Sequence, residues 1–306
     1  MNFWIGITDN DWFKFLSARL PDEVNFWLPG GGAFKALEPG EPFLFKLHSP
    51  INYIVGGGFF VRHTLIPTSL AWEAFGEKNG VACFEDLLLK IRKYRGMKSF
   101  EPDPVIGCII LANPFFFSEK QWIPAPNDFS KNIVRGKTYN TVNFSGNEIW
   151  RQIGLSLNDD VILANPKAAE DTPLYGGEYL TRARLGQGAF RILVTEAYSR
   201  RCAITGERTL PVLEAAHIKP YSQTGPNRIS NGLLLRSDLH KLFDLGYLTI
   251  TRDYSVEVSR RIKEKYENGR EYYALQGKTL RNMPVNPAEY PSSDFIDWHN
   301  QNIYIS

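Results

Sequence analysis

The stretch LEAAHIKPYSQTGPNRISNGLLLRSDLHKLFDLG, residues 213–246, decides the fold of the rear half of this chain of 306 residues. Its first part, residues 213–218, suits a short β-strand that carries His217 near its end. Residues 237–245 have the spacing of apolar side chains expected of a short helix, with Ser237 as its cap. The pattern therefore predicts a strand, a loop and a helix, in that order.

Three polar side chains of this segment could act together. Asn231 lies 14 residues after His217, and His240 lies 9 residues further on, inside the predicted helix. Hydrolysis of a phosphodiester needs a base to activate water, a cation to stabilise charge on the phosphate, and a scaffold that holds both at one phosphorus. The segment offers candidates for all three requirements.

The order and spacing of AAHI, NGLLL and LHKLFD resemble the first His, the central Asn and the final His of the HNH (ββα-metal) endonuclease family. Further segments carry the same resemblance: GQGAFR at 186–191 and CAITG at 202–206 before the motif, and LQGKTLRNMP at 275–284 and PSSDFIDWHNQNIY at 291–304 after it. The resemblance covers roughly residues 180–306. It implies a metal-dependent phosphodiester hydrolase that acts on DNA.

The resemblance also assigns roles to the three side chains. It implies that His217 is the general base that takes a proton from the attacking water, a task that suits a group with a pKa near neutrality. Asn231 would brace the loop between strand and helix through backbone hydrogen bonds. His240 would ligate a divalent cation, either Mg²⁺ or Mn²⁺.

One position departs from the family pattern. Many members have an Asp or His ligand directly before the catalytic His, where this chain has Ala216. Glu214, on the same strand, is the first candidate to replace that ligand, because side chains two residues apart point to one face. Asp238 and Asp244, on either side of His240, are weaker candidates.

The balance of charge points to a polyanionic partner for the rear half. The formal net charge of the chain is only +2, but residues 180–265 carry 15 Lys and Arg against 8 Asp and Glu. Such a concentration of positive charge suits a surface that meets nucleic acid, and it also suits an ordinary solvated face. The candidate phosphate contacts are Arg184, Gln187 and Arg191. Arg184 and Gln187 precede a predicted helix at 188–200, and Arg191 lies on that helix, whose apolar face includes Phe190.

Other classes of protein fit this sequence poorly. Hydrophobic residues make up 43% and charged residues 22%, which is a globular composition, and no run of 18 apolar residues suggests a membrane span. The three cysteines form no CxxC pair, so they suit neither a disulfide framework nor a four-cysteine zinc site. A cytoplasmic location is the default expectation.

The front half reads as an α+β domain of short strands separated by Gly and Pro turns. Aromatic and β-branched runs predict strands at 3–7, 42–47, 52–61 and 105–117, and helical spacing predicts helices at 10–18, 68–75 and 84–94. A polar segment with Pro and Gly follows. The expected organisation is therefore a domain at 1–157, a linker at 158–180 and an HNH domain at 181–306.

Two stretches of the front half, NFWIGITDNDWFKFL at 2–16 and FKALEPGEPFLFKLHSPINYIVGGGFFV at 34–61, resemble the PUA-like superfold and, within it, the EVE domains. SRA and ASCH domains share this architecture, a mixed β-barrel with helices. The resemblance implies recognition of a modified base, typically 5-methylcytosine or 5-hydroxymethylcytosine, flipped out of the duplex into an aromatic pocket. Trp27 and Phe34 flank a glycine-rich loop and are the expected walls, and Lys35 could meet a phosphate.

Together, the two resemblances predict an endonuclease that cuts double-stranded DNA containing modified cytosine, in the manner of EVE-HNH restriction enzymes that act against phage DNA. A homodimer is plausible because cutting two strands usually takes two active sites. Two alternatives stay open at this point. One is an HNH nuclease that reads unmodified DNA or RNA structure, and the other is a binding protein that has lost catalysis, which Ala216 makes conceivable.

Overall fold

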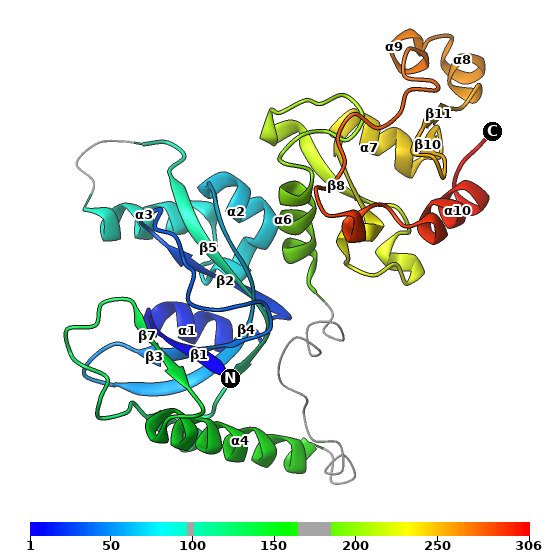
Figure 1. Ribbon diagram of the computed structural model, residues 1–306. Helices are drawn as coiled ribbons and strands as arrows, with labels where there is room; N and C mark the ends of the chain where they lie inside the picture. The colour runs from blue at the N-terminus through cyan, green and yellow to red at the C-terminus, as the bar shows by residue number, and fades with distance from the viewer. Residues whose placement is uncertain (97–100, 165–184) are drawn as a thin grey trace. The chain divides into compact units, whose positions relative to one another are not determined.

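A computed structural model describes residues 1–96, 101–164 and 185–306 of the chain. The chain folds into two compact units, Met1–Arg184 and Leu185–Ser306. We call them the front unit and the rear unit. Figure 1 shows that the front unit is built around a sheet and that the rear unit combines short hairpins with helices. The predicted α+β class is confirmed for both.

One seven-stranded sheet forms the centre of the front unit, with the order β2-β5-β4-β3-β1-β7 and with β6 paired to β4. Strands β1 and β3 run parallel, and the other pairs are antiparallel. The strands are β1 Asn2–Thr8, β2 Glu23–Leu28, β3 Pro42–Leu47, β4 Tyr53–Pro67, β5 Val105–Phe116, β6 Ile123–Pro124 and β7 Gly136–Asn140.

In the parts of the chain that the structure describes, the sheet is open, whereas the resemblance to the PUA-like superfold implies a mixed barrel. Within the described residues, β2 pairs only with β5 and β7 pairs only with β1, so the strand order has two ends and does not close. β7 is a short strand, GKTYN, in which only Tyr139 is buried. A strand of this kind suits the edge of a sheet, where polar side chains discourage further pairing.

The helices of the front unit are α1 Asn10–Ser17, α2 Thr68–Phe75, α3 Phe84–Arg95 and α4 Phe144–Ala164, with 3-10 turns η1 Gly76–Asn79 and η2 Glu119–Gln121. The sequence predicted the first three helices and missed α4, together with β2 and β7. Residues 158–164 of the predicted linker belong to α4. Asp9 caps α1, because its side chain accepts hydrogen bonds from the backbone N–H groups of Asp11 and Trp12.

The rear unit places a hairpin next to a helix, and its second strand, 232–236, falls where the sequence predicts only a loop between the strand and the helix. β8 Leu213–His217 pairs with β9 Gly232–Arg236 in antiparallel register, and α7 Ser237–Asp244 follows directly. The remaining elements are α6 Gln187–Ala197, η3 Leu210–Val212, η4 Tyr221–Gln223, η5 Ile229–Asn231, β10 Leu248–Ile250, β11 Val256–Val258, α8 Arg261–Tyr266, α9 Arg270–Tyr273, η6 Pro287–Glu289 and α10 Ser293–Asn302.

One apolar core holds these elements of the rear unit together. Phe190 and Val194 of α6, Leu233 to Leu235 of β9 and Phe243 of α7 are among its buried side chains. Ser237 proves to be the first helical residue rather than the cap, because the chain turns at Arg236 without a side-chain capping bond. None of the helices in the described parts of the chain is long and apolar enough to span a membrane.

Candidate functional site

His217 lies at the end of β8, opposite Gly232 of β9. Its ring stacks on Phe190 of α6, with centroids 3.8 Å apart and planes 13° from parallel. A Cβ atom at Gly232 would come within 3.1 Å of the Phe190 ring and 2.5 Å of Val194. The absence of a side chain at Gly232 therefore lets α6 approach the hairpin closely enough for Phe190 to reach His217.

The second contact of His217 is polar. Its Nε2 lies 2.8 Å from Oδ1 of Asn227, in the loop between β8 and β9. Burial lowers the pKa of His217 below its usual value of 6.5, although the bond to Asn227 acts in the opposite direction. At neutral pH the imidazole is therefore uncharged, which is the form that can accept a proton from water.

Asn231 ties the two ends of the loop between β8 and β9 to each other. Its side chain is fully buried. The Oδ1 atom accepts a hydrogen bond from the backbone N–H of Lys219 at 2.8 Å, and Nδ2 donates to the carbonyl oxygens of Lys219 at 2.9 Å and Pro226 at 3.0 Å. Lys219 follows His217 by two residues, so Asn231 holds the chain where it leaves β8.

His240, on α7, lies between two carboxylates. Its Nδ1 is 2.6 Å from Oε2 of Glu214 on β8, and its Nε2 is 3.3 Å from Oδ2 of Asp244, one helical turn further along α7. Burial raises the pKa of Asp244, partly offset by the charges of His240 and Lys241. The charges of His240 and Asp244 also act on the pKa of His217, so the hairpin and α7 bring all four groups into one neighbourhood.

The donors around His240 fit a divalent cation by their chemistry. Imidazole nitrogen and carboxylate oxygen are the ligands that Mn²⁺ and related ions accept in proteins, and carboxylate oxygen suits Mg²⁺. In the described residues, no group of three or more His, Cys, Asp or Glu is already arranged to hold a metal ion. A cation bound here would use His240 with Glu214 or Asp244, and each of these carboxylates would exchange its contact with the imidazole for one with the metal.

Residues 202–251 match the HNH endonuclease family model. The match includes β8, β9 and α7 with His217, Asn231 and His240. This part of the chain is therefore an HNH endonuclease domain, which confirms the family that the sequence predicts for it.

Comparisons with whole proteins give weaker likenesses. Among solved structures, the modification-dependent TagI restriction endonuclease is 16% identical, with 93% of this chain and 78% of that chain covered and a TM-score of 0.28. ASCH from Zymomonas mobilis is 10% identical, with 37% of this chain and 69% of that chain covered and a TM-score of 0.27. No curated protein matches the sequence.

Ala216 and Asp238 lie near the HNH residues but make contacts that do not involve His240. Ala216 is fully buried in the apolar core of the rear unit and presents no donor atom to a metal. Asp238 accepts two hydrogen bonds of 2.7 Å from the guanidinium group of Arg236, and this ion pair lowers the pKa of Asp238. Of the three candidate carboxylates, Glu214 and Asp244 contact His240, whereas Asp238 contacts Arg236.

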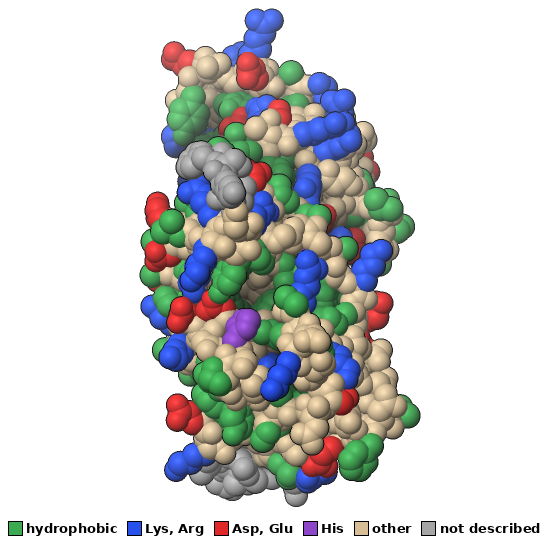
Figure 2. Space-filling model, turned by 90° about the vertical axis from the view of Figure 1, so that its left-hand side faces the viewer, with side chains coloured by type: hydrophobic (Ala, Val, Ile, Leu, Met, Phe, Trp, Pro, Cys, Tyr) green, Lys and Arg blue, Asp and Glu red, His purple; other side chains and the backbone are tan. Residues whose placement is uncertain are grey.

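The predicted phosphate contacts are only partly placed. Arg184 lies outside the described residues. Gln187 is exposed at the first turn of α6, and Arg191 is partly exposed on the same helix as Phe190. Lys35 is exposed in the irregular segment after β2, in the front unit. On the face shown in Figure 2, Lys and Arg side chains are scattered among polar and hydrophobic ones rather than gathered into one patch.

The front unit contains a cavity of about 300 Å³ with aromatic walls. Trp27, one of the two residues expected to wall a base pocket, lines this cavity, and its indole N–H donates to the carbonyl oxygen of Asn79 at 2.9 Å. Phe34 does not line the cavity and packs instead on Trp4, Phe43 and Phe60 in the core. The lining residues are Ile7, Asp9, Trp12, Phe26, Trp27, Leu28, Pro29, Gly30, His48, Tyr94, Val134 and Arg135.

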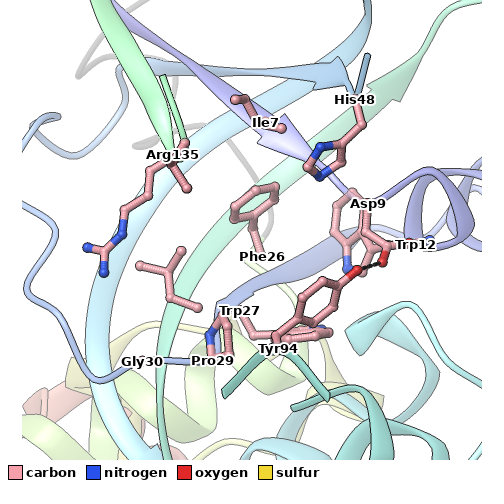
Figure 3. A pocket seen from close by; sticks show the side chains of 12 residues that line it. Ile7, Asp9, Trp12, Phe26, Trp27, Pro29, Gly30, His48, Tyr94 and Arg135 are labelled. Atoms are coloured by element: carbon pink, nitrogen blue, oxygen red, sulfur yellow. Dashed lines mark hydrogen bonds between the residues drawn. The ribbon is translucent and has the colours of Figure 1, made fainter. Parts of the chain in front are cut away.

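Asp9 and Tyr94 form the polar side of this cavity (Figure 3). The Tyr94 hydroxyl donates to Asp9, and Lys90 lies 3.4 Å from the same carboxylate. Burial alone would raise the pKa of Asp9, but Tyr94, the backbone of Trp12 and Lys90 together lower it. Arg135 lies on the opposite side of the cavity. The cavity therefore combines aromatic walls with an ionised carboxylate and a cation.

Proposed function

We propose that the protein is a DNA endonuclease that hydrolyses phosphodiester bonds at His217 and selects DNA containing modified cytosine through its front unit. The observation that carries the hydrolytic part is that β8 and α7 bring His217 together with His240, Glu214 and Asp244 in a domain that matches the HNH family. We assign the roles of base to His217, of loop brace to Asn231 and of metal ligand to His240 with Glu214 or Asp244.

In this reaction the chain itself supplies the base and its support. His217 takes a proton from a water molecule next to the scissile phosphate, while Phe190 fixes the plane of the imidazole. Asn231 holds the segment that follows the base. A divalent cation, when bound, would stabilise negative charge on the phosphate and the leaving oxygen.

The aromatic cavity of the front unit supports the selection of a modified base. An enzyme that reads a flipped base needs aromatic walls for stacking and a few polar groups for the edge of the base. Phe26, Trp27 and Tyr94 offer such walls, and the bond from Trp27 to Asn79 fixes one of them before any ligand arrives. The volume of about 300 Å³ lies at the lower end of the range of ligand pockets, which suits a single base.

The test is cleavage of three matched duplexes containing cytosine, 5-methylcytosine or 5-hydroxymethylcytosine, each with Mg²⁺, with Mn²⁺ and with EDTA. We expect metal-dependent cleavage that is faster on one of the modified duplexes. Equal rates on all three would favour a nuclease that reads unmodified DNA, and binding without cleavage under every condition would favour an inactive binding protein. Cleavage of an RNA duplex of the same sequence at the same rate as the DNA duplex would refute the assignment of DNA as the substrate.

Two tyrosines of the front unit provide a matched pair of variants for the pocket. Tyr94 lines the cavity and is 49% exposed, whereas Tyr53 is 38% exposed and does not line it. We expect Tyr94→Ala to reduce the preference for modified DNA and Tyr53→Ala to preserve it. Sedimentation with and without DNA tests the further proposal that two copies of the chain assemble to cut both strands.

A further inference from the structure

The position of the proton on His217 decides which ring nitrogen can act as the base. A neutral imidazole carries one proton, on Nδ1 or on Nε2, and only the other nitrogen has a free lone pair. In this site, Nε2 faces Oδ1 of Asn227 at 2.8 Å. Within the described part of the chain, Nδ1 has no hydrogen-bond partner.

The orientation of the Asn227 amide follows from its other partner. Nδ2 of Asn227 donates to the backbone carbonyl of Leu185, and a carbonyl oxygen can only accept. The reversed amide would place Oδ1 against that oxygen, and Asn227 is only 8% exposed, so water could not readily compensate. The carbonyl of Leu185 therefore directs Nδ2 toward itself and Oδ1 toward His217.

We infer that Asn227 is a positioning residue that holds the proton of His217 on Nε2 and leaves Nδ1 as the basic atom, an inference that rests on the proposed function. Oδ1 of Asn227 accepts and cannot donate, so the imidazole bonds to it only through Nε2–H. Phe190 covers one face of the ring and leaves the in-plane nitrogens as its polar groups. Water would then approach Nδ1.

Local sequence does not indicate this role. Asn227 belongs to the turn GPNR, where an asparagine is ordinary turn chemistry. Leu185, its other partner, lies 42 residues earlier in the chain. Only the fold brings the carbonyl, the amide and the imidazole into one line of hydrogen bonds.

The test uses the full chain with ¹⁵N-labelled histidine. Long-range proton–nitrogen NMR spectra distinguish a protonated ring nitrogen from an unprotonated one, and His217→Ala identifies the signals of His217 among the five histidines. We expect the Nε2–H form in the natural protein. In Asn227→Ala, we expect a mixture of the two forms, with kcat for DNA cleavage about 10- to 100-fold lower and KM nearly unchanged.

Two further variants separate positioning from a general loss of structure. Asn227→Asp keeps an acceptor for Nε2–H but loses the donor to the carbonyl of Leu185, so we expect it to retain the Nε2–H form while lowering the stability of the rear unit. Asn282→Ala removes a comparable bond, from Nδ2 to the carbonyl of Cys202 at 2.8 Å, without touching His217. We expect Asn282→Ala to leave both the tautomer and kcat unchanged.

The inference is overturned if His217 carries its proton on Nδ1 in the natural protein, or if Asn227→Ala leaves the tautomer unchanged. It is also overturned if the tautomer changes but kcat does not, because the proton on Nε2 would then have no part in cleavage. A natural protein that shows the Nε2–H form but cleaves no DNA with any metal refutes the proposed function instead, and the NMR result distinguishes the two failures.

Discussion

Replacing Asn231 with alanine should loosen the loop that carries His217 and cost about 3 kcal/mol of stability in the rear unit. The side chain is fully buried and makes three hydrogen bonds, to the N–H and carbonyl of Lys219 and to the carbonyl of Pro226. A buried hydrogen bond contributes about 1 kcal/mol net, and backbone groups left without partners add to the cost.

Native-state hydrogen exchange is the suitable assay because it reports each unit separately. We expect amides of β8 and β9 in Asn231→Ala to exchange about 100-fold faster than in the natural protein, which corresponds to about 3 kcal/mol. Asn286→Ala is the control for the substitution itself, since the Asn286 side chain is exposed and accepts one hydrogen bond, from the backbone N–H of Ala288 at 3.1 Å. A change of less than about 0.5 kcal/mol in Asn231→Ala would mean that the loop holds its shape without this amide, and the brace would have to lie elsewhere.

Three further outcomes follow from the same geometry. His217→Ala should lower the cleavage rate by roughly 10² to 10⁴ while gel-shift affinity for DNA persists, and unchanged cleavage would remove His217 from the reaction. Gly232→Ala should lower kcat, because the added Cβ would come within 3.1 Å of Phe190 and displace the ring that stacks on His217. A variant with the same kcat as the natural protein would show that the stacking of Phe190 on His217 has no role in cleavage. Burial lowers the pKa of His299 from 6.5 to about 4, so the unfolded chain takes up a proton as the pH falls through 6.5 while the folded chain does not. His299 therefore makes its full contribution to the free energy of unfolding above pH 6.5. About 3 kcal/mol of that free energy is lost as the pH falls toward 4. An NMR titration that places the pKa of His299 near 6.5 would contradict this prediction.

The sequence predicts most of the elements whose apolar pattern is strong. The helix at 68–75 and the strand at 42–47 occur where the pattern places them, because each buries a regular set of side chains. The sequence does not predict the strand at 136–140, because only Tyr139 in it is buried and an edge strand needs no continuous apolar face. The segment CAITG, which carries part of the family resemblance, forms a turn closed by a hydrogen bond from the backbone N–H of Cys202 to the carbonyl oxygen of Glu207.

The candidate site is predictable only as far as its motif. The family spacing indicates His217, Asn231 and His240, and the alternation of a strand indicates Glu214. Phe190 is predicted as an apolar residue of a helix, but its stacking on His217 depends on how α6 meets the hairpin, which no local pattern encodes. For Phe34 the prediction was wrong. Its position beside a glycine-rich loop suggests a pocket wall, but in the structure its ring packs on Phe43 and Phe60.

The hydrogen bond between Leu185 and Asn227 bears on how this nuclease could be combined with other proteins. A chimera that joins the catalytic part to a new targeting domain needs a junction before Leu185, because starting the chain at Phe190 would keep the family motif but discard the carbonyl that orients Asn227. The smallest transplantable unit is therefore longer than the 202–251 segment by which the family is recognised.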